Sequence, residues 1–246
     1  MVITKDIKMA DVIHMNHFSL SILERFGIEL GFGDKSVDET CKIYNVDTDF
    51  FLEIINAFIH TEYFPKKQLQ NFPVKLITDY LQKTHNYYMQ IKVPEIESLI
   101  EEMVLSCSTQ KENINLLKRF FSEYKEELKN HIQREEKVVF PYTQLIENAF
   151  YSDKIDKQTL RQMDEYSIDI FEKEHDNIEE KLYDLKNIII KYLPQPNNKT
   201  LCNKLLHELF GLEKDINDHS RIEDKVLVPK ILEMEKGIRK KAGLKV

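Results

Sequence analysis

Hydrophobic residues recur at helical spacing over most of the chain, but the length of the amphipathic runs changes along it. Before Phe64 the runs are short and are interrupted by turn signals, among them the Gly-rich stretch GIELGFGDKS. Beyond Pro73 the runs are much longer, as in helices that bury one face against one another. The pattern therefore predicts a group of short helices followed by a set of long ones.

Three short helices are predicted in the first part of the chain. The first lies within DVIHMNHFSLSILERFG and ends at Gly27. The second begins after Ser36, which forms a capping box with Glu39 three residues later. The third is DTDFFLEIINAFIHTEYF, for which Asp47 or Thr48 is the expected N-cap. These helices predict a small helical N-terminal domain over residues 1–64.

Two prolines and a polar composition mark residues 65–73 as a linker, and four long helices are predicted beyond it. Hairpin-scale connections would arrange these helices as an up-down-up-down four-helix bundle over residues 74–246. We expect bends near Pro94 and Pro141, because proline lacks a backbone N–H. The predicted helices cover residues 74 to about 106, 112 to about 148, roughly 164 to 192, and about 198 to 237.

An eleven-residue pattern occurs twice in the bundle, as HIQREEKVVFP from His131 and as HSRIEDKVLVP from His219. Residues four apart lie on the same face of a helix, so His131 and Glu135 point to one location, as do His219 and Glu223. A single such pair is ordinarily an exposed ion pair. Its repetition with matching Lys, Val and Pro residues favours a shared chemical role.

Two further histidines, His85 and His175, lie alone in the first and third predicted helices, at comparable distances before His131 and His219. Four histidines and two glutamates can therefore converge in the core. Burying them without a cation would cost several kcal/mol for each group, and imidazole with carboxylate suits iron or manganese. Counting ligands predicts two ions, both carboxylates bridging, two histidines on each ion, a bridging oxide or hydroxide, and room for a small diatomic ligand.

This pattern, with His85 and the EHD of residues 174–176, resembles the hemerythrin-like domains, which are HHE cation-binding four-helix bundles. The resemblance covers about residues 74 to 236 and implies an all-α fold and a non-haem di-iron centre. The ligands that it implies are His85, His131, Glu135, His175, His219 and Glu223. In the same pattern we assign Val138 to the buried stripe, and Glu136 and Asp224 to solvent or to the orientation of a neighbouring histidine.

The N-terminal stretch GIELGFGDKSVDETCKIYNVDTDFFLEIIN resembles the short helical domain that precedes the bundle in iron–sulfur-cluster-repair di-iron proteins. That resemblance implies a response to nitric oxide and oxidative damage. Members of that family usually carry two adjacent cysteines followed by glycine in the first loop. Here the matching positions are Gly31 and Phe32, followed by Gly33, so the thiol pair is absent.

Composition narrows the class of protein further. The net charge of −7 argues against a nucleic-acid surface, and no apolar run approaches the ~20 residues that span a membrane. The three cysteines are far apart and form no CxxC motif, so we expect reduced thiols. A soluble, cytoplasmic protein is predicted.

The leading hypothesis is a cytoplasmic non-haem di-iron protein of the nitric-oxide and oxidative stress response that repairs iron–sulfur clusters by donating iron. Its small ligand would be O2 or NO, and its partners damaged iron–sulfur proteins. The alternative is an O2- or NO-binding sensor that relays to a partner through the N-terminal domain. An enzyme acting on NO is a third reading, and a metal-free bundle is the plainest one. Ligand type does not exclude manganese, and no feature of the sequence decides for or against a homodimer.

Overall fold

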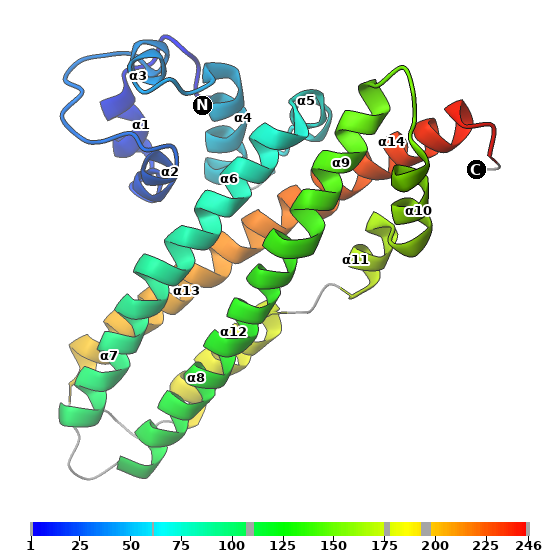
Figure 1. The fold of residues 1–246 in the computed structure, drawn as a ribbon. Coiled ribbons are helices and arrows are strands. Elements are labelled where there is room, and N and C mark those ends of the chain that lie inside the picture. The colour runs from blue at the N-terminus through cyan, green and yellow to red at the C-terminus, as the bar shows by residue number, and fades with distance from the viewer. Residues whose placement is uncertain (1, 61, 107–110, 175–177, 193–197, 245–246) are drawn as a thin grey trace.

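The computed structural model describes residues 2–60, 62–106, 111–174, 178–192 and 198–244, and its fold is all-α. Short helices at the N-terminus lie beside one end of a long bundle, and the chain ends at that bundle's α14 (Figure 1). No helix among the described residues is both long enough and apolar enough to cross a lipid bilayer.

The N-terminal helices are α1 (Met9–Met15), α2 (Ser19–Arg25), α3 (Val37–Ile43) and α4 (Thr48–Ile59). The predicted capping box is confirmed, because Ser36 and Glu39 each bond the other's backbone N–H. Asp47 is the N-cap of α4 and accepts a hydrogen bond from the N–H of Phe50 at 2.9 Å. The first predicted helix is two helices, because the chain becomes extended at Asn16.

In the described part of the chain the bundle consists of four helical columns, each with one π-helical turn. The short α5 (Lys66–Asn71) precedes them, inside the segment predicted as a linker. A further helix, α10 (Lys157–Glu165), lies between the second and third columns, and Asp156 is its N-cap. The columns are α6 (Val74–Tyr87), η1 (Tyr88–Lys92) and α7 (Val93–Ser106); α8 (Lys111–Arg134), η2 (Glu135–Val139) and α9 (Phe140–Tyr151); α11 (Ile168–Glu174), α12 (Ile178–Asn187) and η3 (Ile188–Tyr192); and α13 (Lys199–Ile222), η4 (Glu223–Leu227) and α14 (Val228–Lys241).

In the sequence a proline stands two residues after each of these π-turns, and the structure describes three of the junctions. The N–H groups of Val93, Phe140 and Val228 each bond the carbonyl five residues back, and each of these residues directly precedes a proline. A π-turn contains one residue more than an α-turn, so a residue without an N–H can follow it while the helix continues. The prolines therefore mark a change in helical register rather than the end of a helix.

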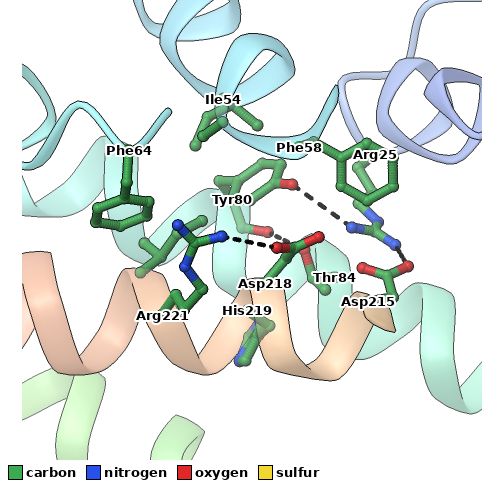
Figure 2. A pocket seen from close by; sticks show the side chains of 12 residues that line it. Arg25, Ile54, Phe58, Phe64, Tyr80, Thr84, Asp215, Asp218, His219 and Arg221 are labelled. Carbon is green, nitrogen blue, oxygen red and sulfur yellow. Dashed lines mark hydrogen bonds and ion pairs between the residues drawn. The ribbon is translucent and has the colours of Figure 1, made fainter. Parts of the chain in front are cut away.

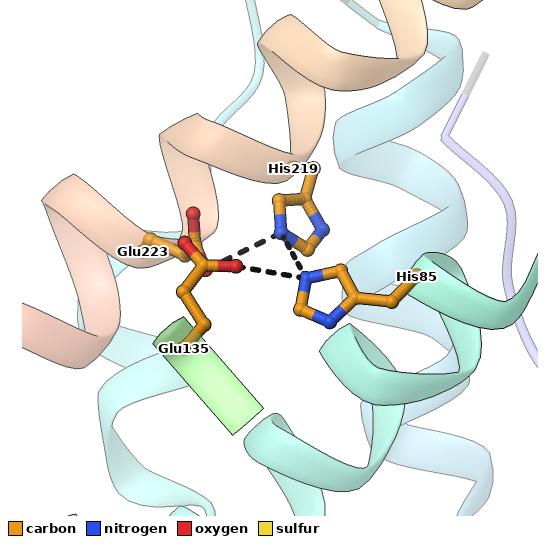
Figure 3. A group of neighbouring side chains, drawn as sticks. All are labelled: His85, Glu135, His219 and Glu223. Atoms are coloured by element: carbon orange, nitrogen blue, oxygen red, sulfur yellow. Dashed lines mark hydrogen bonds and ion pairs between the residues drawn. The ribbon is translucent and has the colours of Figure 1, made fainter. Parts of the chain in front are cut away.

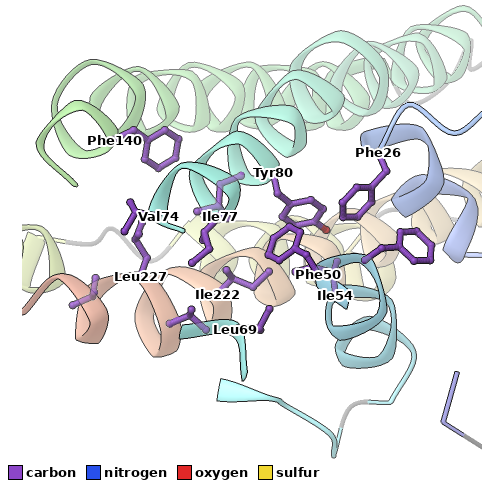
Figure 4. Close-up of a cluster of buried hydrophobic side chains, with 14 of the residues drawn as sticks. Phe26, Phe50, Ile54, Leu69, Val74, Ile77, Tyr80, Phe140, Ile222 and Leu227 are labelled. Atoms are coloured by element: carbon purple, nitrogen blue, oxygen red, sulfur yellow. The ribbon is translucent and has the colours of Figure 1, made fainter. Parts of the chain in front are cut away.

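The described residues form two hydrophobic cores. The first joins the N-terminal helices to one end of the bundle, where Phe26 and Phe50 lie beside Tyr80, and Leu69 lies near Ile222 (Figure 4). The second fills the other end of the bundle with residues of η1, α7, α8, α12 and α13. The second column passes from the second core to the first between Ile132 and Val139, and the fourth between Ile216 and Ile222. A polar layer separates the two cores.

Candidate metal centre

The candidate ligands occupy positions of the apolar stripe that faces the bundle interior. In α8 the buried residues recur every three or four positions up to Leu128 and Ile132, and Glu135 takes the next position. In α13 His219 stands in the same relation to Ile216, and Glu223 follows one turn later. The stripe thus explains why these polar side chains are buried, and it is a signal that can be read from the sequence.

Four of the six predicted ligands converge on one point, as Figure 3 shows. The Nε2 atom of His85 lies 3.0 Å from Oε2 of Glu135 and 3.1 Å from Nε2 of His219. His219 Nε2 lies 3.3 Å from Oε1 of Glu223. One donor atom from each of these buried residues lies within 4.8 Å of all the others, so together they could hold a single ion.

Glu135 also contacts a second histidine on its other side. Its Oε1 atom lies 2.8 Å from Nε2 of His131, while its Oε2 atom faces His85. Each carboxylate oxygen therefore faces a different imidazole, which is the arrangement of a carboxylate that bridges two ions. His131 is at the edge of the layer, with 13% of its side chain exposed. His175 lies outside the described residues.

The charges in this layer compensate one another at close range. Burial lowers the pKa of His85, but its hydrogen bonds to Glu135 and Glu136 outweigh burial and raise the pKa to about 9. Burial and the nearby Glu223 carboxylate raise the pKa of Glu135, yet bonds from His131 and His85 hold it below its usual value. Two buried carboxylates therefore depend on positive charge, which protons or metal ions can supply.

The donor set fits a bound metal ion. Two imidazole nitrogens that approach to 3.1 Å, each beside a carboxylate, can share a cation in place of a proton. Imidazole and carboxylate together suit iron or manganese. The protein's own bonds keep the nitrogens aimed inward, because His85 Nδ1 donates to Oε1 of Glu136 at 3.1 Å and so leaves Nε2 facing the layer. The ring of Phe140 stacks on His85, with centroids 5.6 Å apart.

Two sequence expectations around the site have different outcomes. Glu136 contacts His85, as one of its two predicted roles required. The assignment of Val138 to the buried stripe is wrong, because 43% of this side chain is exposed. The π-turn does not explain this exposure, because the counterpart Val226 lies in the equivalent turn η4 and is fully buried. The difference is in packing: α5 packs against η4, whereas the buried residues next to Val138 are Val139 and Phe140.

Sequence reasoning missed two charged residues close to the site, Arg25 in α2 and Asp215 in α13, which form a buried ion pair. Tyr88 donates a hydrogen bond to Oδ1 of Asp215 at 3.3 Å. Asp215 lies one turn before His219, so the i, i+4 rule could have drawn attention to it. Nothing in the sequence pairs Asp215 with Arg25, since 190 residues separate them.

A helical bundle with inward-facing histidines and glutamates in one buried layer defines the class of four-helix-bundle metal-binding proteins. Residues 94–231 match the hemerythrin HHE cation-binding domain. The match covers more than half of the chain, and the chain belongs to this family. His85 precedes the matched residues, so its place in the ligand set rests on the geometry given above. No curated protein matches the chain.

Proposed function

We propose that the polar layer binds two iron ions. His85 and His219 hold one ion, His131 and His175 hold the other, and Glu135 and Glu223 lie between them. The observation that carries this proposal is that the two oxygens of Glu135 face His85 and His131 separately. The flanks of position 175 support its inclusion, because Phe171 belongs to the first core and Ile178 to the second. In the sequence, position 175 lies between these two flanking residues.

We further propose that this centre serves iron–sulfur cluster repair by iron donation, in a cytoplasmic response to nitric oxide and oxidative damage. Bound iron would supply redox chemistry and an affinity for O2 or NO. The protein's residues hold the ions in a layer between two apolar cores, and Glu136 keeps His85 in its ligating tautomer. Damaged iron–sulfur proteins are the proposed partners, and the resemblance of the N-terminal stretch supports this role.

Metal analysis of protein purified from iron-replete cells tests the centre. The wild type should hold about two irons per chain, and Glu135→Ala or Glu223→Ala no more than about one, because each removes a bridging carboxylate. Glu126→Ala, an exposed residue of α8, is the control and should keep the full complement. Full iron content in both ligand variants would refute the ligand assignment. Manganese in place of iron would change the metal but not the site.

Restoration of an inactivated [4Fe–4S] enzyme by the iron-loaded protein tests the repair role. Activity should return with the wild type and fail to return with Glu135→Ala. The absence of any restoration by the fully loaded wild type would reject iron donation and leave the metal centre itself untouched.

A sensor of O2 or NO is the second candidate function, and the position of the N-terminal helices favours it. Arg25 of α2 pairs with Asp215, one turn from His219, so a change at the centre has a direct contact through which to reach these helices. Rapid mixing of the reduced protein with O2 or NO separates the alternatives. A sensor gives a spectral change that lasts and reverses when the gas is removed, whereas an enzyme consumes the gas over many turnovers.

A further inference from the structure

The strongest feature outside the ligand layer is the ion pair between Arg25 of α2 and Asp215 of α13. Only 2% of the Arg25 side chain and 10% of the Asp215 side chain are exposed. Fully buried arginine is rare in proteins unless it is paired, because its charge is costly to remove from water. The N-terminal helices thus place a paired cation inside the junction with the bundle.

Further contacts connect this pair with the two histidines that approach each other most closely. Tyr88, three residues after His85, donates its hydroxyl to Asp215. The Tyr88 ring packs edge-on against the ring of His219, with centroids 5.9 Å apart. The guanidinium of Arg25 lies over the ring of Tyr87, 4.6 Å from its centroid. The Arg25 side chain therefore ties the column of His85 to the column of His219, one turn away from both.

The N-terminal helices and the segment after α4 cover the same side of α13 on either side of this pair. Lys214 donates to the carbonyl of Phe58 at 3.2 Å and lies over its ring. The guanidinium of Arg221 lies 4.7 Å from the ring centroid of Phe64. Figure 2 shows Arg25 directed at Asp215. The cavity left at this junction has a volume of ≈ 20 Å³, room for about one water molecule.

The equivalent position in the first copy of the repeat has different surroundings. Glu127 precedes His131 by four residues, as Asp215 precedes His219. Glu127 pairs with Lys181 of α12, and both side chains are 46% exposed. The two copies therefore share the ligands and the acidic residue one turn before them. Only the second copy has its acidic residue covered by the N-terminal helices.

We propose that the Arg25–Asp215 pair makes the N-terminal helices a retaining device for one of the two metal ions. This inference rests on the proposed di-iron centre. By clamping Tyr88 and Asp215 together, Arg25 holds His85 and His219 at the distance that one ion requires. The ion at His85 and His219 is therefore retained, and the ion at His131 and His175 is the one more readily released. Movement of the N-terminal helices changes how firmly the first ion is held.

The test uses the full-length protein loaded with Fe(II) and a chromogenic Fe(II) chelator under anaerobic conditions. In Arg25→Met one of the two iron equivalents should be released at least about tenfold faster than in the wild type, as expected when the support of a ligating histidine is lost. The other equivalent should keep its rate. Lys181→Met is the matched control, because it breaks the exposed pair of the first copy, and both of its rates should equal those of the wild type.

If Arg25 has a merely structural role, both iron equivalents should be released faster in Arg25→Met. That result would overturn the proposal, and so would release rates equal to those of the wild type. If Arg25→Met does not fold, Arg25→Lys decides, since it keeps the charge but loses the planar fork. Arg25→Lys should accelerate the release of the same iron equivalent by a smaller factor. Equal acceleration of the release of both equivalents would again contradict the proposal.

A second readout does not require metal. Hydrogen exchange of the metal-free protein should accelerate by a larger factor in peptides covering residues 212–223 of Arg25→Met than in peptides covering residues 124–135, which share only the global loss of stability. Unchanged exchange over residues 212–223 would show that Arg25 does not hold this part of α13. A wild type that binds fewer than two irons would reject the proposed di-iron centre, whereas the exchange experiment would still report on the clamp.

Discussion

The two copies of the repeat have the same ligands but different neighbours. In the first copy, Glu127 forms an exposed ion pair and Val138 is 43% exposed. In the second, Asp215 forms a buried ion pair, and Val226, the counterpart of Val138, is fully buried. The repeat therefore determines which polar groups enter the buried layer. Segments outside the repeat determine how far each copy is shielded from water.

The cover over Val226 comes from the segment that precedes the bundle. α5 packs against η4, and its Leu69 is fully buried in the first core. Gln70 donates its side-chain amide to the carbonyl of Lys225 at 3.3 Å, and Lys230 donates back to the carbonyl of Gln70 at 2.9 Å. The segment expected to be a linker thus packs on the second copy, whereas Val138 of the first copy is left exposed.

The largest expected effect comes from breaking the two ion pairs in turn. Arg25→Met leaves the buried carboxylate of Asp215 without its partner, which costs about 3–5 kcal/mol of unfolding free energy. Lys181→Met breaks a pair that is 46% exposed on both sides and should cost about 0–1 kcal/mol. Urea denaturation of the metal-free proteins measures both values. Equal losses would show that the N-terminal helices do not distinguish the two copies.

The next effect is a pH dependence that arises from the carboxylates of the first copy. The folded pKa of His85 is about 9, above its ordinary value of 6.5, so protonated His85 stabilises the folded metal-free protein. The full contribution is present below pH 6.5 and is lost as the pH rises through 9, up to about 3 kcal/mol. Urea denaturation between pH 6 and 10 should give this loss in the wild type. His85→Gln should remove most of this pH-dependent loss of stability. If the variant loses as much stability over this pH range as the wild type, the loss does not arise from His85.

Truncation of the two equivalent valines should have a smaller effect. Val226→Ala removes two buried methyl groups and leaves a cavity under α5, at a cost of about 2 kcal/mol. Val138→Ala removes the same groups from an exposed position and should change stability by less than about 0.5 kcal/mol. Thermal unfolding of the two variants side by side provides the comparison. A similar loss at Val138 would mean that another surface covers the first copy.

Much of the fold and most of the described site follow from local patterns in the sequence. The apolar stripes and the capping residues Ser36 and Asp47 give the helices, and the i, i+4 repeat gives His131, Glu135, His219 and Glu223. These signals are short-range, because a helix brings residues four apart together whatever surrounds it. The prediction that His85 is a ligand required the additional assumption that the four helices form an up-down-up-down bundle.

What the sequence left out depends on long-range contacts. Val226 is buried because α5 packs on η4, whereas the equivalent Val138 is exposed, and the repeat itself does not distinguish the two positions. Arg25 was missed because its partner, Asp215, is brought close only when α2 packs on α13. Both errors lie where one copy of the repeat differs from the other, and neither difference is contained in the repeat itself.

The smallest effect concerns the support of a ligand by the first copy. Glu136 accepts a hydrogen bond from Nδ1 of His85, which fixes the tautomer and makes Nε2 a better ligand. Glu136→Gln keeps the shape but removes the charge, and should weaken binding of one iron about tenfold, or about 1.4 kcal/mol. Competition with a chelator of known affinity measures this change, with Glu127→Gln as the control on the same column. Unchanged iron affinity in Glu136→Gln would mean that the charge of Glu136 does not help His85 to bind the ion. The orientation of the His85 ring would then depend on its stacking with Phe140.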